Sequence, residues 1–167
     1  MKKFVLILGA LVTSFFGYSQ NEDVYNNSGL SKGNIKDYKG AIADFSKAIK
    51  INPKDAKAYY NRGFAKGNLK DFQGAIADFT KVIEINPNDA KAYYNRGVAK
   101  GNLLDYRGAI ADYTKAIEIN PTSEITYYNR GFAKITIGQK DSGCLDFSKA
   151  GELGYSEAYE MIKKYCK

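Results

Sequence analysis

The chain has no histidine and no tryptophan among its 167 residues, and only two cysteines and three prolines. Without imidazole it lacks the commonest general base and the commonest metal ligand of proteins. Two cysteines cannot complete a four-ligand zinc site. The sequence also has no nucleophile beside a base, no carboxylate pair at a useful spacing and no phosphate-binding loop. We therefore expect neither an enzyme nor a metal or other cofactor.

Long apolar runs are also scarce, except at the N-terminus. Residues 1–19 begin with Lys2 and Lys3, continue with about thirteen apolar residues and end near Gly17 and Ser19. This order is typical of a secretory signal peptide cleaved after Ser19. Because roughly twenty residues are needed to cross a bilayer as a helix, a permanent anchor is the less favoured alternative. We expect a protein exported to the periplasm or secreted from a bacterial cell envelope, with no stable membrane span after cleavage.

The composition is that of a globular protein with a mixed-charge surface. Hydrophobic residues make up 44% and charged residues 26% of the chain, which fits neither a disordered nor a membrane protein. Without Lys2 and Lys3 the formal net charge falls from +7 to +5, because no acidic residue precedes Glu22. Lysine and aspartate alternate and form no basic run, so we expect no nucleic-acid partner.

Most of the chain repeats itself every 34 residues. Residues 56–89 and residues 90–123 are identical at 26 of 34 positions. The same frame extends back over residues 20–55 and forward over residues 124–153, where the second half of the copy diverges. A period of this length indicates a repeat architecture, in which each copy is one supersecondary unit.

Each copy carries the signals for two helices. In the second copy, Asp55 is a good N-cap and residues 67–68, Gly-Asn, are a good stop, which predicts a helix over residues 56–66. Asp71 caps a second helix over residues 72–84, whose apolar residues recur at spacings of three and four. A lone hairpin of this size cannot cover its own apolar stripe, so neighbouring copies must stack.

These residues resemble the tetratricopeptide repeat (TPR) family over residues 22–153. The period, a glycine in the first helix, alanine and an aromatic residue in the second, and a proline at the junction coincide in at least three copies. The resemblance implies an all-α, right-handed superhelical solenoid of about four helix-turn-helix repeats. It also implies a non-catalytic scaffold that binds a peptide or protein on a concave face lined by the first helices.

Two positions depart from the usual family pattern, because they carry basic residues where the family has mainly apolar ones. They are the arginines Arg62, Arg96 and Arg130, and the lysines Lys66, Lys100 and Lys134. We expect their alkyl stems to pack and their charges to reach solvent or a stripe of aspartates. The stripe consists of Asp44, Asp78, Asp112 and Asp146.

The last part of the chain, residues 154–167, is expected to form a capping helix that covers the end of the array. Ser156 is its candidate N-cap. If this helix folds back on the preceding one, Cys144 and Cys166 can meet, and an exported protein would keep that disulfide. The alternatives are a buried thiol at Cys144 with a free Cys166, or a bond from Cys166 to another molecule.

The resemblance places one set of repeating side chains on the concave face as candidates for partner binding. They are Lys57, Tyr60, Asn61, Phe64, Lys91, Tyr94, Asn95, Val98, Tyr128, Asn129 and Phe132. Tyrosine offers flat apolar area with a hydroxyl, asparagine pairs with a peptide backbone in both directions, and lysine favours carboxylates. For the tyrosines, we favour a role in partner binding on the concave face. For the asparagines, a structural role and a ligand-binding role both stay open.

We call this repeating set of side chains the ladder. It does not identify the partner. Some family members bind acidic chaperone tails through a clamp of five Lys, Asn and Arg residues, but only Asn61 and Lys91 fit it here, so we reject that interpretation. An envelope glycan or peptidoglycan is the alternative ligand, since aligned tyrosine and asparagine side chains also suit sugars. Self-association stays open.

Overall fold

The structure is a computed structural model that describes residues 21–166. The predicted signal peptide lies outside the described residues, as do Gln20 of the first copy and Lys167 of the cap. The described part consists of helices and contains no strand, which confirms the all-α prediction. None of these helices is both long and apolar enough to cross a bilayer.

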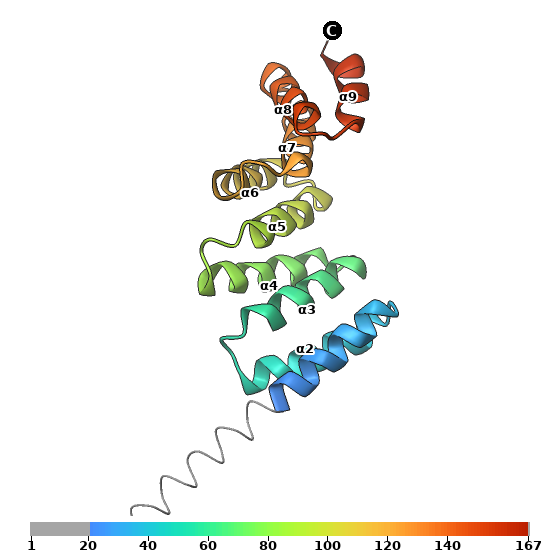
Figure 1. The fold of residues 1–167 in the computed structure, drawn as a ribbon, viewed down its shortest axis with the longest axis vertical. Coiled ribbons are helices and arrows are strands. Elements are labelled where there is room, and N and C mark those ends of the chain that lie inside the picture. Colours follow the sequence, from blue (N-terminus) through green and yellow to red (C-terminus); the bar gives the residue numbers. More distant parts are fainter. Residues whose placement is uncertain (1–20, 167) are drawn as a thin grey trace, which may run out of the picture.

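The helices stack in pairs along an elongated array (Figure 1). Residues 21–34 are helical and precede the elements labelled in the figure. These elements are α2 (Tyr38–Ile51), α3 (Ala56–Asn68), α4 (Phe72–Ile85), α5 (Ala90–Asn102), α6 (Tyr106–Ile119), α7 (Glu124–Thr136), α8 (Lys140–Glu152) and α9 (Glu157–Tyr165). Each pair falls within one 34-residue copy, and the second helix of a pair packs on the first helix of the next.

Aspartate side chains begin the helices at the predicted places. The Asp71 carboxylate accepts a hydrogen bond of 2.9 Å from the Gly74 N–H, and Asp55 accepts one of 2.8 Å from the Lys57 N–H. Equivalent bonds cap α2, α5 and α6. Each bond satisfies one of the N–H groups that have no partner within the helix.

The predicted end of the first helix is wrong by two residues. Gly67 lies inside α3, which continues to Asn68, and the chain reverses at Lys70 instead. Lys70 has φ +63, and the N–H groups of Lys70 and Asp71 bond back to the carbonyls of Gly67 and Lys66, at 2.9 Å each. A left-handed residue normally favours glycine, so the nearby glycine misled the prediction.

Glycines in the first helices allow close approach of the paired helices. A Cβ at Gly97 would lie 2.7 Å from a ring carbon of Tyr113, and one at Gly131 would lie 2.9 Å from the Gly143 carbonyl oxygen. Ala75 and Ala109 in the second helices are fully buried. Small residues at these crossings therefore set the spacing within each pair.

The C-terminal end is closed by α9, which packs on Phe147 and Ala150 of α8 through Ala158 and its apolar neighbours. A disulfide joins Cys144 in α8 to Cys166, with a Cα–Cα distance of 5.7 Å. The sequence leaves three states of the cysteines open, and the structure has the one with the intramolecular bond.

Two details of the predicted cap are wrong. Ser156 does not cap α9, because its backbone is already helical (φ −61, ψ −32) and its hydroxyl contacts the Glu157 carboxylate instead. The sequence also suggests Gly151 and Gly154 for the turn before this helix, but Gly151 is buried in the last turn of α8, and Gly154 with φ +106 makes the reversal.

Candidate functional site

Three hollows follow one another along the array at equivalent positions. The first, of about 290 Å³, lies between the helix over residues 21–34, α2 and α3. The second, of about 410 Å³, lies between α3, α4 and α5. The third, again of about 290 Å³, lies between α5, α6 and α7. We call this row the concave groove, because neighbouring hollows share lining residues: Phe64 lines the first and second, and Val98 and Asn102 line the second and third.

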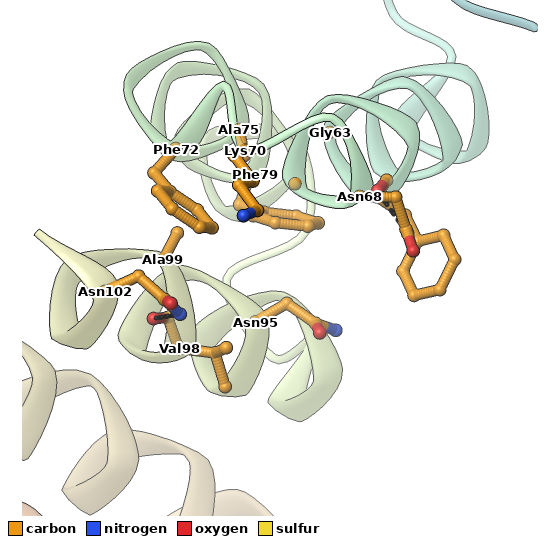
Figure 2. Close-up of a pocket in the computed structure, with 12 residues that line it drawn as sticks. Gly63, Asn68, Lys70, Phe72, Ala75, Phe79, Asn95, Val98, Ala99 and Asn102 are labelled. Carbon is orange, nitrogen blue, oxygen red and sulfur yellow. Dashed lines mark hydrogen bonds between the residues drawn. The ribbon is translucent and has the colours of Figure 1, made fainter. Parts of the chain in front are cut away.

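The second hollow of the concave groove is lined mainly by apolar surface. In the second hollow, the rings of Phe72 and Phe79 come from α4, while Val98 and Asn95 project from α5 (Figure 2). Phe64 is 52% exposed at the edge of the first two hollows. Large exposed apolar side chains in a hollow are unusual on a surface without a binding role.

The apolar side chains that line the hollows from the first helices share one position of the repeat. They are Leu30, Phe64, Val98 and Phe132, of which Val98 is partly buried and the other three are exposed. Sequence reasoning missed Leu30, although it stands 34 residues before Phe64 and the period marks it. It also did not single out Phe72 and Tyr106 as site residues, whereas both reach the hollows.

The tyrosines and asparagines of the ladder join neighbouring repeats. Asn95 donates from Nδ2 to the Tyr60 hydroxyl at 2.9 Å, and Asn129 donates to the Tyr94 hydroxyl at 2.9 Å. The Tyr60 ring also meets Phe79 edge-on, with centroids 5.6 Å apart. Burial raises the pKa of Tyr60 and of Tyr94, so both phenols stay protonated. These asparagines therefore have a structural role.

Asn61 differs from the other two ladder asparagines. The tyrosine that it would contact is replaced by Asn26 in the first repeat, and the Asn61 side chain forms no hydrogen bond within residues 21–166. It lines the first hollow and also a fourth one, of about 490 Å³. Its amide is thus available to a ligand.

The fourth hollow lies near the starts of the first helices and is basic. The exposed lysines Lys57 and Lys91 line it together with Tyr60, Asn61 and Asn86. Asp89 is the acidic residue among its lining residues, and its carboxylate accepts a hydrogen bond from the Ala92 N–H as the cap of α5. The positive starts of the helices and the two lysines favour an anionic group here.

The aspartates of the stripe all form ion pairs within the chain. This confirms the pairing predicted from the sequence. The Arg62 guanidinium makes two bonds to Asp78, of 2.9 and 2.6 Å, and Lys66 lies 2.8 Å from the same carboxylate. Arg62 also donates to Ser46 of the preceding repeat and lies over the Tyr59 ring. The same arrangement recurs around Asp112 and Asp146.

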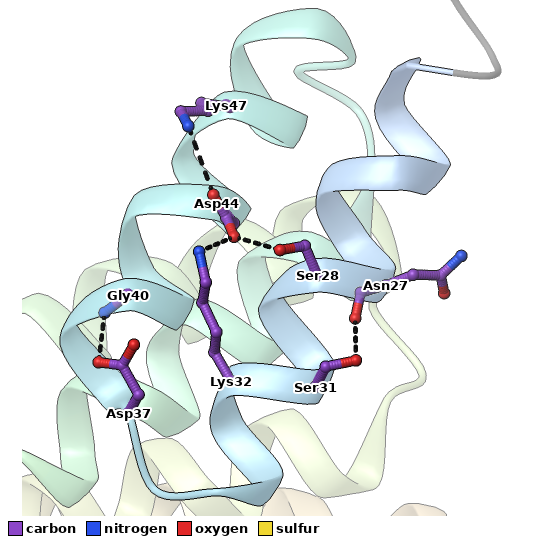
Figure 3. Close-up of polar contacts among 8 residues, drawn as sticks. All are labelled: Asn27, Ser28, Ser31, Lys32, Asp37, Gly40, Asp44 and Lys47. Atoms are coloured by element: carbon purple, nitrogen blue, oxygen red, sulfur yellow. Dashed lines mark hydrogen bonds and ion pairs between the residues drawn. The ribbon is translucent and has the colours of Figure 1, made fainter.

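In the first repeat, the buried aspartate has other partners in place of an arginine (Figure 3). Asp44 accepts hydrogen bonds from Lys32 and Ser28 and contacts Lys47. The Lys32 bond, and then the Ser28 bond, lowers the pKa of Asp44. In none of the four repeats does a carboxylate of the stripe remain for acid–base chemistry or for a ligand.

The structure therefore gathers most of the predicted partner-binding residues around these hollows. Tyr128 is the exception, because it lines none of the four. Its ring packs against Tyr155 before α9, with centroids 4.8 Å apart, and against Phe147. Within residues 21–166 there is also no cluster of three metal-ligating side chains.

Comparisons with known proteins agree with this geometry. The tetratricopeptide repeat model matches residues 56–89 and 90–123, and a second TPR repeat model matches residues 35–70. Together they span more than half of the chain, which belongs to the TPR family. No curated protein matches it significantly by sequence.

Several solved structures share the fold. A crystal structure of MamA is 28% identical, with a TM-score of 0.79, over 83% of this chain and 81% of that one. The Arabidopsis OM64 TPR domain is 28% identical, with a TM-score of 0.69, over 71% and 98%. The first TPR of Spaghetti (RPAP3), bound to the HSP90 peptide SRMEEVD, is 25% identical, with a TM-score of 0.69, over 71% and 94%. TPR domains are typically modules for protein–protein interaction and are generally non-catalytic.

Proposed function

We propose that the chain is a non-catalytic scaffold that binds an extended peptide segment in the concave groove. The observation that carries the proposal is the recurrence of a hollow at each of three successive repeat junctions, with an apolar side chain at the same repeat position in each and polar side chains beside it. A peptide that crosses the junctions would place an apolar side chain in each hollow. Its backbone would face the amide and hydroxyl groups at the rim.

The rim has both donors and acceptors for such a backbone. The Tyr60 and Tyr94 hydroxyls accept hydrogen bonds from asparagines, so each keeps its own proton to donate. Asn61 has its whole amide free. We assign the main backbone contact to Asn61, and apolar contacts to Phe64, Val98 and their equivalents.

A related fold supports a peptide ligand but not a particular sequence. The Spaghetti TPR structure holds a chaperone peptide. Here the clamp for acidic chaperone tails is incomplete, since only Asn61 and Lys91 fit it. We expect apolar side chains to supply most of the affinity, with an acidic group tolerated near Lys57 and Lys91.

A glycan is the less favoured ligand. Sugar recognition uses open aromatic faces, whereas the Tyr60 and Tyr94 rings are half-buried and pack against Phe79 and Tyr113. Their hydroxyls are also engaged in the structure of the array.

We further propose that the protein acts outside the cytoplasm. The disulfide between Cys144 and Cys166 supports this location, because such bonds persist in oxidising compartments. Fractionation of cells that express the full chain provides the test. Recovery of a shortened chain in the periplasm or medium is expected, and a full-length chain confined to the cytoplasm would contradict the proposal.

The binding test begins with selection of peptides from a random-sequence library on the mature chain. Fluorescence anisotropy then compares the selected peptides on variants. We expect Phe64→Asp and Asn61→Ala each to weaken binding about tenfold or more, since central contacts dominate affinity.

The matched control is Ala77→Asp, which adds the same charge at an exposed position of α4 that lines none of the hollows. It should bind the peptides as the wild type does. Equal affinity of all three variants would contradict the groove. Retention of cell-wall glycan, lost with Tyr94→Ala, together with a failure to select any peptide, would favour the glycan instead.

A further inference from the structure

A row of exposed aliphatic side chains lies at the turns that join the first and second helices of the repeats. Ile35 is 77% exposed, Leu69 42%, Leu103 38% and Leu104 72%. None of these four lines the hollows described above. We call this surface the turn edge. Its four aliphatic side chains lie outside the concave groove, whereas the neighbouring Lys70 lines the second hollow.

The turn edge holds long side chains at positions where the backbone favours glycine. Lys36, Lys70 and Leu104 occupy equivalent places, with φ of 62, 63 and 64, and Gly138 occupies the same place in the fourth repeat. A bulky residue at positive φ is a backbone outlier, and such outliers concentrate at functional sites. The Leu104 side chain is also exposed to water. Neither its backbone conformation nor its side-chain packing therefore stabilises the fold.

The free charges of the turn edge are positive. Lys36, Lys39, Lys70 and Arg107 form no ion pair within the part of the chain that the structure describes. The aspartates of the same turns are Asp37, Asp71 and Asp105, and each accepts a hydrogen bond of 2.9 Å from a glycine N–H. Each of these three carboxylates is thus engaged as a helix cap, whereas the four basic side chains have no such partner among the described residues.

Aromatic residues follow the aliphatic ones in the sequence, and each of them also lines one of the hollows. Tyr38, Phe72 and Tyr106 open the second helices and are half-buried. Aliphatic side chains, amphipathic aromatic rings that follow them and lysine or arginine alongside are the composition of protein segments that lie in a membrane interface. The first three turns lie on the same side of the array, at the right in Figure 1.

We infer that the turn edge docks on an anionic lipid surface. Ile35, Leu69, Leu103 and Leu104 would enter the boundary between headgroups and acyl chains, and the free lysines and Arg107 would contact the acidic headgroups. Each contact is weak alone, and three turns that act together make the binding useful.

Vesicle co-sedimentation of the mature chain tests this inference. We expect binding to vesicles of phosphatidylcholine with about a third phosphatidylglycerol, little binding to phosphatidylcholine alone, and weaker binding at high salt. The double variant Lys36→Gln/Lys70→Gln should lose several-fold in affinity for the anionic vesicles.

Leu104→Gly separates binding from folding. Glycine relieves the left-handed backbone, so the melting temperature should stay the same or rise, while vesicle affinity falls several-fold. The matched control is Leu145→Gln, which removes a leucine of similar exposure, 71%, from α8. It should bind vesicles as the wild type does.

Three results would overturn the inference. One is no binding of the wild type to the anionic vesicles. Another is equal vesicle affinity of Leu104→Gly, Leu145→Gln and the wild type. The third is loss of peptide binding, without any vesicle binding, in the variants of the turn edge, which would assign this surface to a protein partner.

Discussion

At the residue scale, one buried carboxylate in each repeat is the centre of the main polar network. The Asp112 side chain is 5% exposed and is held by Arg96 and Lys100, at 2.7 and 2.8 Å. Arg96 also donates to Thr80 of the preceding repeat. A single aspartate therefore links two helices of its own repeat and, through arginine, the repeat before it.

Asp112→Ala is expected to lower the free energy of unfolding by about 3 kcal/mol, because it leaves two partly buried cations without their partner. Urea unfolding followed by circular dichroism measures this change. Lys115→Ala is the control. It breaks the exposed pair with Glu118 and should cost less than about 0.5 kcal/mol. Equal costs for the two variants would show that the buried network does not stabilise the fold.

Lys70→Gly is expected to raise the free energy of unfolding by about 0.5–1 kcal/mol. Glycine adopts φ +63 without the steric cost that lysine bears, and the Lys70 side chain has no ion pair within residues 21–166 to lose. Thermal and urea unfolding measure the gain. A loss of stability would mean that the lysine stem has a packing role at this turn.

The sequence predicted residue roles where periodicity and charge agree. The spacing of 16 residues between Arg62 and Asp78 recurs in three repeats, and opposite charges on paired helices must meet or reach water. The free amide of Asn61 could not be predicted, because it depends on which tyrosine the preceding repeat lacks and on how the repeats are packed. The left-handed Lys70 was missed because a glycine stood nearby.

At the scale of helices, glycine at the crossing of paired helices is a packing requirement. Gly97→Ala would place a Cβ 2.7 Å from the buried ring of Tyr113 and should cost about 1–3 kcal/mol. Gly97→Leu should cost more, because it forces α5 and α6 apart.

Gly67→Ala is the matched control within the same kind of helix. Nothing lies within 4 Å of a Cβ at Gly67, and alanine is favoured over glycine in a helix by about 1 kcal/mol. This variant should therefore unfold at a higher temperature than the wild type. The same sign of change at both glycines would contradict the register of helix pairs.

The disulfide is expected to hold α9 in place. The helix has nine residues and no side-chain N-cap, so it is unstable alone. Cys144→Ser with Cys166→Ser should lower the free energy of unfolding by about 3 kcal/mol. Hydrogen exchange should rise in α9 while α3 to α6 keep their protection, since contacts in repeat arrays are between neighbours. Unchanged exchange in α9 would assign its docking to packing alone.

The helix boundaries follow from capping and proline signals to within about two residues. Ser156 was a poor guide, because a capping serine needs an extended backbone and the tight turn after Gly154 leaves it helical. Such a turn depends on how α9 meets α8. Local sequence alone does not determine that geometry.

At the scale of the whole molecule, the repeat places the same apolar position at every junction, and the hollows follow from stacking. Periodicity therefore marks the groove once the stacking face is known. Which polar side chains join repeats and which stay available to a ligand is seen only in the assembled array. There Asn95 and Asn129 join repeats and Asn61 does not.

The most direct test of the central claim is NMR chemical-shift mapping of the mature chain with a peptide selected on it. We predict shifts at Asn61, Phe64, Val98 and Phe132, and none at Ala77, Ala111 or Leu145. Shifts confined to the latter three, or to α9, would contradict binding in the concave groove.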